Sequence, residues 1–132
     1  LQYPNFNEPF IITTNASGYA IGAILSQGEI GKDRPIAYTS RVLNDHEKKY
    51  ETYDKEALAI YYAILHFRPY VYGKHFTVVT DHKPLTSFRT KKDPNSRVAK
   101  WMYNLLEYEF EVIHKAGKSN VNADALSRNP IE

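Results

Sequence analysis

Three acidic residues lie at the end of a predicted strand or within a predicted helix, at positions where carboxylates could bind a metal ion. Asp81 follows the apolar run FTVVT of residues 76–80, Glu56 lies in the first turns of a long helical pattern, and Asp124 lies in the short segment NVNADALSR. The carboxyl ends of strands are where open α/β sheets present ligands, and converging carboxylates suit hard cations such as Mg²⁺. Taken singly, each acid also has a structural interpretation, as a first-turn, strand-end or solvated helix residue. Taken together, the three favour a cation site.

Strand and helix patterns alternate along the chain that must position these acids. Runs of β-branched and aromatic residues predict strands at residues 10–14, 19–25, 34–40, 76–80 and 110–114. Helical spacing and cap signals predict helices at residues 52–68, 84–88, 96–108 and 120–128. The order is β-β-β-α-β-α-α-β-α, with the first strand buried on both faces and joined to the second as a hairpin. This order predicts the α/β class.

Local signals mark the ends of the predicted helices. Asn44 and Glu47 have the spacing of a capping box ahead of the helix that starts near Thr52, and Pro69 is expected to end that helix. Asn120 is the predicted cap of the last helix. The apolar stripe of the long helix, expected to lie on the sheet, consists of Leu58, Tyr61, Ile64 and Leu65.

Length and composition indicate a single domain spanning residues 1–132. The 132 residues, 42% of them hydrophobic and 24% charged, suit one compact unit with an ordinary core. Nothing approaches the roughly 20 apolar residues of a membrane span, and the first residues do not resemble a signal peptide. Without Cys the chain forms no disulfide or thiolate metal site. A net charge of +2 means that any nucleic-acid-binding surface is local.

Four separated segments resemble one protein family. They are NASGYAIGAILSQ (15–27), YETYDKEALAIYYAILHFRPYVYG (50–73), VVTDHKPL (78–85) and NVNADALSR (120–128). In this order and spacing they resemble the ribonuclease H domain that follows the reverse transcriptase in gypsy-type LTR retrotransposon polyproteins, over essentially the whole chain. The resemblance implies a ribonuclease H-like fold, a five-stranded mixed sheet whose first three strands are antiparallel, flanked by helices. It also implies cleavage of the RNA strand of RNA:DNA hybrids, assisted by two Mg²⁺ or Mn²⁺ ions.

The resemblance assigns the family's four metal-ligand positions to Asn15, Glu56, Asp81 and Asp124. At the first position the family carries an aspartate that bridges both ions, in the sequence DAS, whereas this chain reads NAS. Three carboxylates then face the four positive charges of two Mg²⁺, and an amide oxygen attracts a dication less strongly than a carboxylate. We therefore expect a domain that folds and binds hybrid but cleaves it poorly.

The sequence leaves the origin of Asn15 open. It could be an inactivating substitution made so that a substrate complex survives, a decayed or recruited element copy, or a natural variant that tolerates an amide. The segment around Asn15 otherwise matches the family, which argues against long neutral decay.

Two histidines lie near the assigned acids. His114 stands ten residues ahead of Asp124, as does a histidine that assists product release in retroviral relatives, so the resemblance makes His114 a catalytic candidate. The loop KAGKSN (115–120) departs from those relatives, and a structural role at a strand end is the alternative. His82, beside Asp81, is expected to point away from the metals.

Substrate contacts are expected mostly on the nucleic-acid backbone, because a protein tells RNA from DNA by the 2′-hydroxyl without reading sequence. The alternative for these positions is an ordinary hairpin turn, a helix start or a solvated basic face. The candidates are Ser17 and Gly18 after Asn15, Thr52 and Tyr53 one helical turn before Glu56, and Lys83, Arg97 and Lys100 as phosphate contacts.

Two function classes remain open on the sequence. The first is a hybrid-cleaving nuclease whose partners are an RNA:DNA hybrid and the reverse transcriptase domain of the same polyprotein, with no membrane partner. We expect it inside the cell, in a cytoplasmic retroelement particle or the nucleus, and not secreted. The second is a non-catalytic hybrid-binding or spacer module derived from such an element. An integrase-like or resolvase-like nuclease fits less well, because DHKPL and ADALSR match the ribonuclease H domain.

Overall fold

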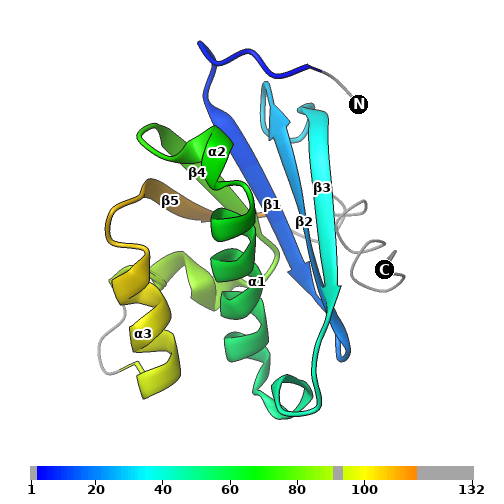
Figure 1. Ribbon diagram of the computed structural model, residues 1–132, viewed down its shortest axis with the longest axis vertical. Helices are drawn as coiled ribbons and strands as arrows, with labels where there is room; N and C mark the ends of the chain where they lie inside the picture. The colour runs from blue at the N-terminus through cyan, green and yellow to red at the C-terminus, as the bar shows by residue number, and fades with distance from the viewer. Residues whose placement is uncertain (1–2, 91–93, 116–132) are drawn as a thin grey trace.

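The computed structural model describes residues 3–90 and 94–115, and these build one mixed sheet with helices packed on it (Figure 1). The sheet has the strand order β3-β2-β1-β4-β5. Its strands are β1 (Phe10–Ala16), β2 (Ala20–Gln27), β3 (Arg34–Val42), β4 (His75–Thr80) and β5 (Glu109–His114). β2 is antiparallel to β1 and β3, whereas β4 is parallel to β1 and β5. The predicted five-stranded sheet with three antiparallel strands first is therefore confirmed.

β1 lies at the centre of the sheet and is buried on both faces, as its apolar run predicts. Phe10 and Ile12 join the main core on the face that α1 (Thr52–His66) covers. Ile11 and Thr13 point to the other face and are 5% and 8% exposed. Because β1 ends at the candidate site, its burial fixes the position of the residues at its carboxyl end.

α1 packs on β1 and β2 through small residues as well as large ones. Ala57, Ile60, Ala63 and Ile64 are completely or almost completely buried, since alanine lets the helix backbone approach the sheet. The predicted apolar stripe was wrong at Leu65, which is 43% exposed. The sequence pattern gave weight to large apolar residues, whereas the buried face is defined by the alanines.

The carboxyl end of α1 differs slightly from the prediction. The helix ends at His66, and Pro69 lies in the first turn of the short helix α2 (Arg68–Val71) instead of directly ending α1. Proline is tolerated there because the first turn has no intrahelical acceptor for its missing N–H.

The sequence predicted the kind of structure in two further connections. Asn44 and Glu47 form the capping box, with Glu47 N–H donating to Asn44 Oδ1 at 2.8 Å and Asn44 N–H donating to Glu47 Oε1 at 3.0 Å. It opens the 3₁₀ turn η1 (Glu47–Lys49), directly ahead of α1. Residues 83–87 form a second 3₁₀ turn, η2 (Lys83–Ser87), where one or two helical turns were expected.

α3 (Ser96–Asn104) lies beside α1 (Figure 1). Its cap is Asn95, whose Oδ1 accepts the Val98 N–H at 2.8 Å. The prediction that this helix continues to residue 108 was wrong, because Leu105 and Tyr108 turn inward and are 1% and 2% exposed. The helix predicted at residues 120–128 lies outside the described residues.

Candidate active site

Asn15 lies near the carboxyl end of β1, and Asp81 directly follows β4, the parallel neighbour of β1. β1 and β4 are parallel, with Thr13 opposite Val79. Continued by two residues on each strand, this register would bring Asn15 opposite Asp81. Asn15 is 3% exposed, and its Oδ1 accepts the Ala16 N–H at 2.8 Å. Asp81 directly follows β4 and is partly exposed.

Glu56 approaches the same end of the sheet from α1. It lies in the second turn of that helix and is 6% exposed. A pocket of about 220 Å³ separates the start of α1 from the β1–β2 turn. The residues that line it are Ala16, Ser17, Gly18, Thr52, Lys55 and Glu56. The predicted substrate residues Ser17, Gly18 and Thr52 are thus gathered beside Glu56.

The β1–β2 turn that forms one wall of this pocket is held by its own hydrogen bonds. Ser17 N–H donates to the Ala20 carbonyl at 2.8 Å, and the Ala20 N–H donates to Ser17 Oγ at 3.1 Å. These bonds close the hairpin tightly behind Asn15, so the turn backbone presents a fixed surface to the pocket.

Tyr53 links α1 to the segment that carries Asp81. Its ring packs edge-on against His82, with the ring centroids 6.1 Å apart. Burial raises the pKa of the Tyr53 hydroxyl, and the neighbouring Asp54 carboxylate adds to the effect. Burial also lowers the pKa of His82, reinforced by His114 and opposed by Asp81. Tyr53, His82 and the end of β4 therefore form one packed unit.

His114 is the last residue of β5 and pairs with Thr80, the last residue of β4. Its side chain is exposed, and the next residue continues the pairing through the Lys115 N–H, which donates to the Thr80 carbonyl at 2.9 Å. The backbone of His114 therefore lies at the same end of the sheet as Asp81.

The donor atoms gathered here are oxygens, which suits Mg²⁺ or Mn²⁺. Glu56 and Asp81 supply carboxylates and Asn15 an amide oxygen. Across residues 3–90 and 94–115, however, no three His or acidic side chains lie close enough to form a metal site by themselves. Asp124, the remaining predicted ligand, lies outside the described residues. The residues present fit part of a hard-cation site.

A second pocket, of about 450 Å³, lies on the other side of the α1 N-terminus. Arg97, predicted as a phosphate contact, is found here with its Nη1 2.6 Å from Asp54 Oδ2 and its guanidinium 3.9 Å from the Tyr50 ring centroid. Asn95 Nδ2 also donates to Asp54, at 3.0 Å. The lining residues are His46, Lys49, Tyr50, Glu51, Asp54, Asn95 and Arg97.

Sequence reasoning missed the residues that complete these pockets. Lys55 was not singled out, although it directly precedes Glu56, and Lys49 and Asn95 were also missed. For Asn95 the signal was available, since an asparagine ahead of a helical pattern is a typical cap. The other two predicted phosphate contacts, Lys83 and Lys100, are exposed on η2 and α3 and line neither pocket described above.

Comparisons with known proteins bear on this arrangement. A family model described as an RNase H-like domain found in reverse transcriptase matches residues 5–108. The Pol polyproteins of the Drosophila melanogaster transposons 412 and opus are 48% and 50% identical to the chain, over 100% and 98% of its length. The chain spans only 11% and 13% of these two relatives.

A solved structure of similar fold is LC11-RNase H1 in complex with an RNA/DNA hybrid. It aligns with a TM-score of 0.70 at 16% identity, over 90% of this chain and 94% of that one. At this identity the likeness shows the fold alone. Among the described residues, no helix has the length and apolar character needed to cross a membrane.

Proposed function

This chain belongs to the family of RNase H-like domains found in reverse transcriptases, and from that premise we propose that it is a retrotransposon ribonuclease H domain with impaired cleavage. Its substrate would be the RNA strand of an RNA:DNA hybrid. The proposal is supported by the location of Asn15, Glu56 and Asp81 toward one end of the sheet, and by the resemblance that assigns Asn15 to a position where the family has an aspartate.

Glu56, Asp81 and Asn15, together with Asp124 at the family's fourth position, are the residues that would hold two Mg²⁺ or Mn²⁺ ions. When bound, such ions activate the attacking water and stabilise the leaving 3′ oxygen. Glu56 supplies a carboxylate that is 6% exposed, and carboxylate oxygens are the ligands that hard cations prefer. Asn15 is equally buried but contributes no negative charge.

The pocket between the β1–β2 turn and α1 suits the RNA strand. Ser17 and Gly18 present backbone there, and Thr52 adds a hydroxyl beside Glu56. Contacts of this kind read sugar and phosphate and allow 2′-hydroxyl recognition without sequence readout. Tyr53 packs just behind this surface, and His114 could assist product release from the end of β5.

The second pocket is a candidate site for a phosphate of the other strand. Arg97 and Lys49 line it, and the Arg97 side chain remains 37% exposed despite its ion pair with Asp54. Asp54 orients the guanidinium while compensating part of its charge, so the contribution of Arg97 to binding should be smaller than that of an unpaired cation. Lys83 and Lys100 would add exposed, salt-sensitive contacts.

The test of the proposal is the replacement Asn15→Asp. The two side chains have almost the same volume, so β1 and its turn should accept the change without repacking. If the missing bridging charge costs several kcal/mol of transition-state stabilisation, the replacement should raise the rate of RNA cleavage in Mg²⁺ by about 10² to 10⁴-fold. A labelled hybrid should yield 5′-phosphate and 3′-hydroxyl ends, and duplex DNA should stay intact.

The control is Asp81→Asn in the Asn15→Asp background, which should abolish the gained activity. Should Asn15→Asp prove as inert as the starting chain, the fault would lie elsewhere and the charge argument would be abandoned. Equal and substantial cleavage by both would show that an amide suffices at this position.

The second candidate function is a non-catalytic hybrid-binding or spacer module, which the buried neutral amide of Asn15 favours. The retained carboxylates of Glu56 and Asp81 speak against a spacer, because a spacer does not need acidic side chains at these positions. A titration separates the two: a spacer should show neither Mn²⁺ binding nor hybrid binding.

A further inference from the structure

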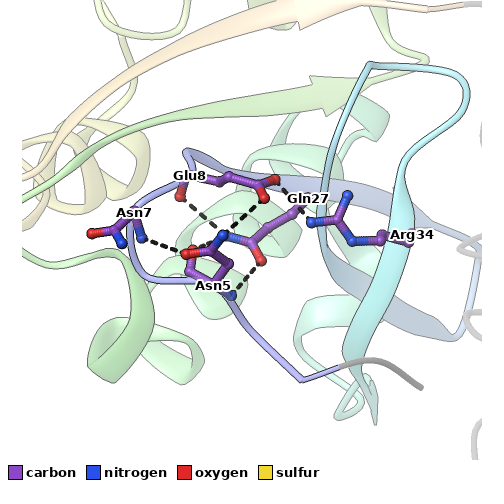
Figure 2. Close-up of polar contacts among 5 residues, drawn as sticks. All are labelled: Asn5, Asn7, Glu8, Gln27 and Arg34. Atoms are coloured by element: carbon purple, nitrogen blue, oxygen red, sulfur yellow. Dashed lines mark hydrogen bonds and ion pairs between the residues drawn. The ribbon is translucent and has the colours of Figure 1, made fainter.

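Residues 3–9 precede β1 and are held against the sheet by a buried glutamine (Figure 2). Gln27, the last residue of β2, is 0% exposed. Its Oε1 accepts the Asn5 N–H at 2.9 Å, and its Nε2 donates to the Asn5 carbonyl at 2.7 Å and to the Glu8 carbonyl at 3.0 Å. The side chain thus serves the backbone of a segment about 20 residues away along the chain.

Charged side chains secure the same segment from β3 and from its own turn. Glu8 Oε1 lies 2.8 Å from Arg34 Nη2, and this hydrogen bond is the main cause of the lowered pKa of Glu8. Asn5 Nδ2 also donates to Glu8 Oε2 at 3.0 Å, and the Glu8 N–H donates to the Asn5 carbonyl at 3.0 Å. The segment is therefore folded on itself and tied to two strands.

Aromatic packing adds a third attachment, to α2. Phe6 stacks on Tyr70 with ring centroids 6.2 Å apart and meets Phe10 edge-on at 5.7 Å. Lys74 Nζ lies 4.9 Å from the centre of the Phe6 ring and donates to the Phe6 carbonyl at 2.6 Å. A segment without regular secondary structure thus makes contacts with β2, β3, α2 and Lys74, the residue before β4.

This attachment lies at the opposite end of β1 from the candidate active site (Figure 1). β1 begins at Phe10, next to the segment, and reaches Asn15 five residues later, about 17 Å further along the strand. Changes to Gln27 should therefore leave the metal-ligand positions in place. The segment also turns apolar surface outward, since Tyr3 is 96% exposed and Phe6 is 50% exposed.

We propose that residues 3–9, fixed against the sheet by Gln27, determine the position of the preceding reverse transcriptase domain of the same polyprotein relative to this domain. The inference rests on the proposed place of this domain after a reverse transcriptase. A flexible tether of n residues lets its ends wander over about 5–6 Å × √n, so fixing the last seven residues before β1 narrows the positions open to the neighbouring domain. The exposed Tyr3 and Phe6 would pack against that domain.

The experiment uses the polyprotein segment that contains both domains. Because this chain has no Cys, one spin label can be placed at Glu109→Cys, an exposed position at the start of β5, and the other on the surface of the reverse transcriptase domain. Distances between the labels are measured by double electron–electron resonance. We expect one narrow distribution with Gln27 present, and a distribution about twofold broader or more in Gln27→Leu.

Hydrogen exchange shows whether residues 3–9 have been released while the sheet stays folded. In Gln27→Leu the Asn5 amide should exchange about tenfold faster or more, with the Ile12 amide unchanged. Ile24→Val, a buried change on the other face of β2, is the matched control and should alter neither the distances nor the Asn5 amide. If Gln27→Leu unfolds the sheet, Arg34→Gln combined with Lys74→Gln replaces it, because these two side chains hold Glu8 and the Phe6 carbonyl.

Two outcomes would contradict the proposed role of residues 3–9. One is a broad distribution with Gln27 intact, and the other is a faster Asn5 amide with an unchanged distribution. Neither readout depends on metal binding or RNA cleavage, so failure of the Asn15→Asp assay would leave this test unaffected.

Discussion

Asn15 differs from an aspartate by a single terminal group, and its surroundings explain why that difference matters. The residue is 3% exposed and its Oδ1 already accepts the Ala16 N–H, so the amide is fixed in the strand. Solvent cannot readily compensate a missing charge at such a position. The missing carboxylate should therefore lower the affinity for cations more than it changes the stability of the fold.

The first prediction at this scale concerns metal binding. With an amide at position 15, the protein free of nucleic acid should bind Mn²⁺ more tightly than Mg²⁺ and hold fewer than two ions firmly. Asn15→Asp should tighten both, since it adds a carboxylate to the same site. Isothermal titration of metal-free protein measures this, with Asp81→Asn as the variant expected to bind least. Firm binding of two Mg²⁺ by the unchanged chain would contradict the prediction.

Lys55 gives a second prediction, on hybrid binding. It is half-buried in the pocket beside Ser17 and Glu56, and no ion pair within the described ranges involves it. A cation in this position should meet a phosphate of the RNA strand. Lys55→Gln should weaken hybrid binding about 3–10-fold and reduce the slope of log K against log salt by about 1. Fluorescence anisotropy at several salt concentrations measures both.

The control for that measurement is Lys32→Gln, an exposed lysine in the β2–β3 connection. It should leave affinity and slope unchanged. A lower affinity with an unaltered slope in Lys55→Gln would point to a packing role for the lysine and argue against a phosphate contact.

At the scale of elements, the connection from β3 to α1 determines where Glu56 lies. Arg41 on β3 donates to both carboxylate oxygens of Glu47, at 2.8 and 3.0 Å, and Glu47 closes the capping box with Asn44. The connection is thereby fixed to β3 shortly before α1 begins. This small network fixes the start of the helix that carries the site.

Glu47 also yields a prediction about pH. Its hydrogen bonds with Arg41 are the main cause of a pKa below the ordinary value of 4.5. The folded protein thus binds this proton less readily than the unfolded chain, so the stabilisation is complete above about pH 4.5 and is lost as pH falls through the lowered pKa. Glu47→Gln should lower the free energy of unfolding by about 1–2 kcal/mol at pH 7 and by less at pH 3.

Urea unfolding at the two pH values measures this difference. The matched control is Asp45→Asn, two residues away, whose carboxylate is fully exposed and lies 3.9 Å from Lys48 Nζ. A surface pair of this kind contributes little, so its variant should show no such pH dependence. A loss in Glu47→Gln that is equal at both pH values would contradict the assignment.

The sequence predicted helices and strands correctly where the local pattern determines them. The predictions were wrong where contacts with residues distant in the chain determine the strand bounds or the burial. β1 was predicted at residues 10–14 but extends to Ala16, because pairing with Ile21 and Gly22 outweighs the low strand preference of Asn15 and Ala16. Leu65 was predicted to lie in the core because it is a large apolar residue, but its side chain is exposed. The residues alone pointed to a cation site at Glu56, Asp81 and Asp124, whereas the place of Asn15 in that site came from the family resemblance.

Contacts far apart in the chain carry no local signal. Gln27 is buried and holds the backbone of Asn5, 22 residues away, and Arg97, predicted as a phosphate contact, is paired with Asp54, 43 residues away. Sequence reasoning identified the type of these residues but not their partners, because tertiary packing selects them. The pairing of β1 with β4, the strands that lead to Asn15 and Asp81, is equally non-local.

For the whole molecule, the attachment of residues 3–9 and the candidate active site lie at opposite ends of β1. Its amino end meets the held segment 3–9, and its carboxyl end leads to Asn15 and the pocket beside Glu56. The net charge is only +2, so attraction to nucleic acid depends on a few local cations instead of a general field. Both pockets at the start of α1 contain such cations, Lys55 in one and Lys49 with Arg97 in the other.

This arrangement predicts weak hybrid binding by the domain alone. A handful of phosphate contacts supports little affinity at physiological salt, whereas a joined reverse transcriptase domain that binds the same hybrid would raise the effective concentration at this site to the millimolar range. Kd for an RNA:DNA hybrid should therefore fall about 10²-fold or more when the two domains are joined. Anisotropy with the chain alone, the joined protein, and an equimolar mixture of unlinked domains measures the effect. The mixture should behave like its tighter component, and the chain alone should favour hybrid over duplex DNA because duplex DNA lacks 2′-hydroxyls. Equal affinity of the isolated and joined forms would show that this chain already contains a complete binding surface.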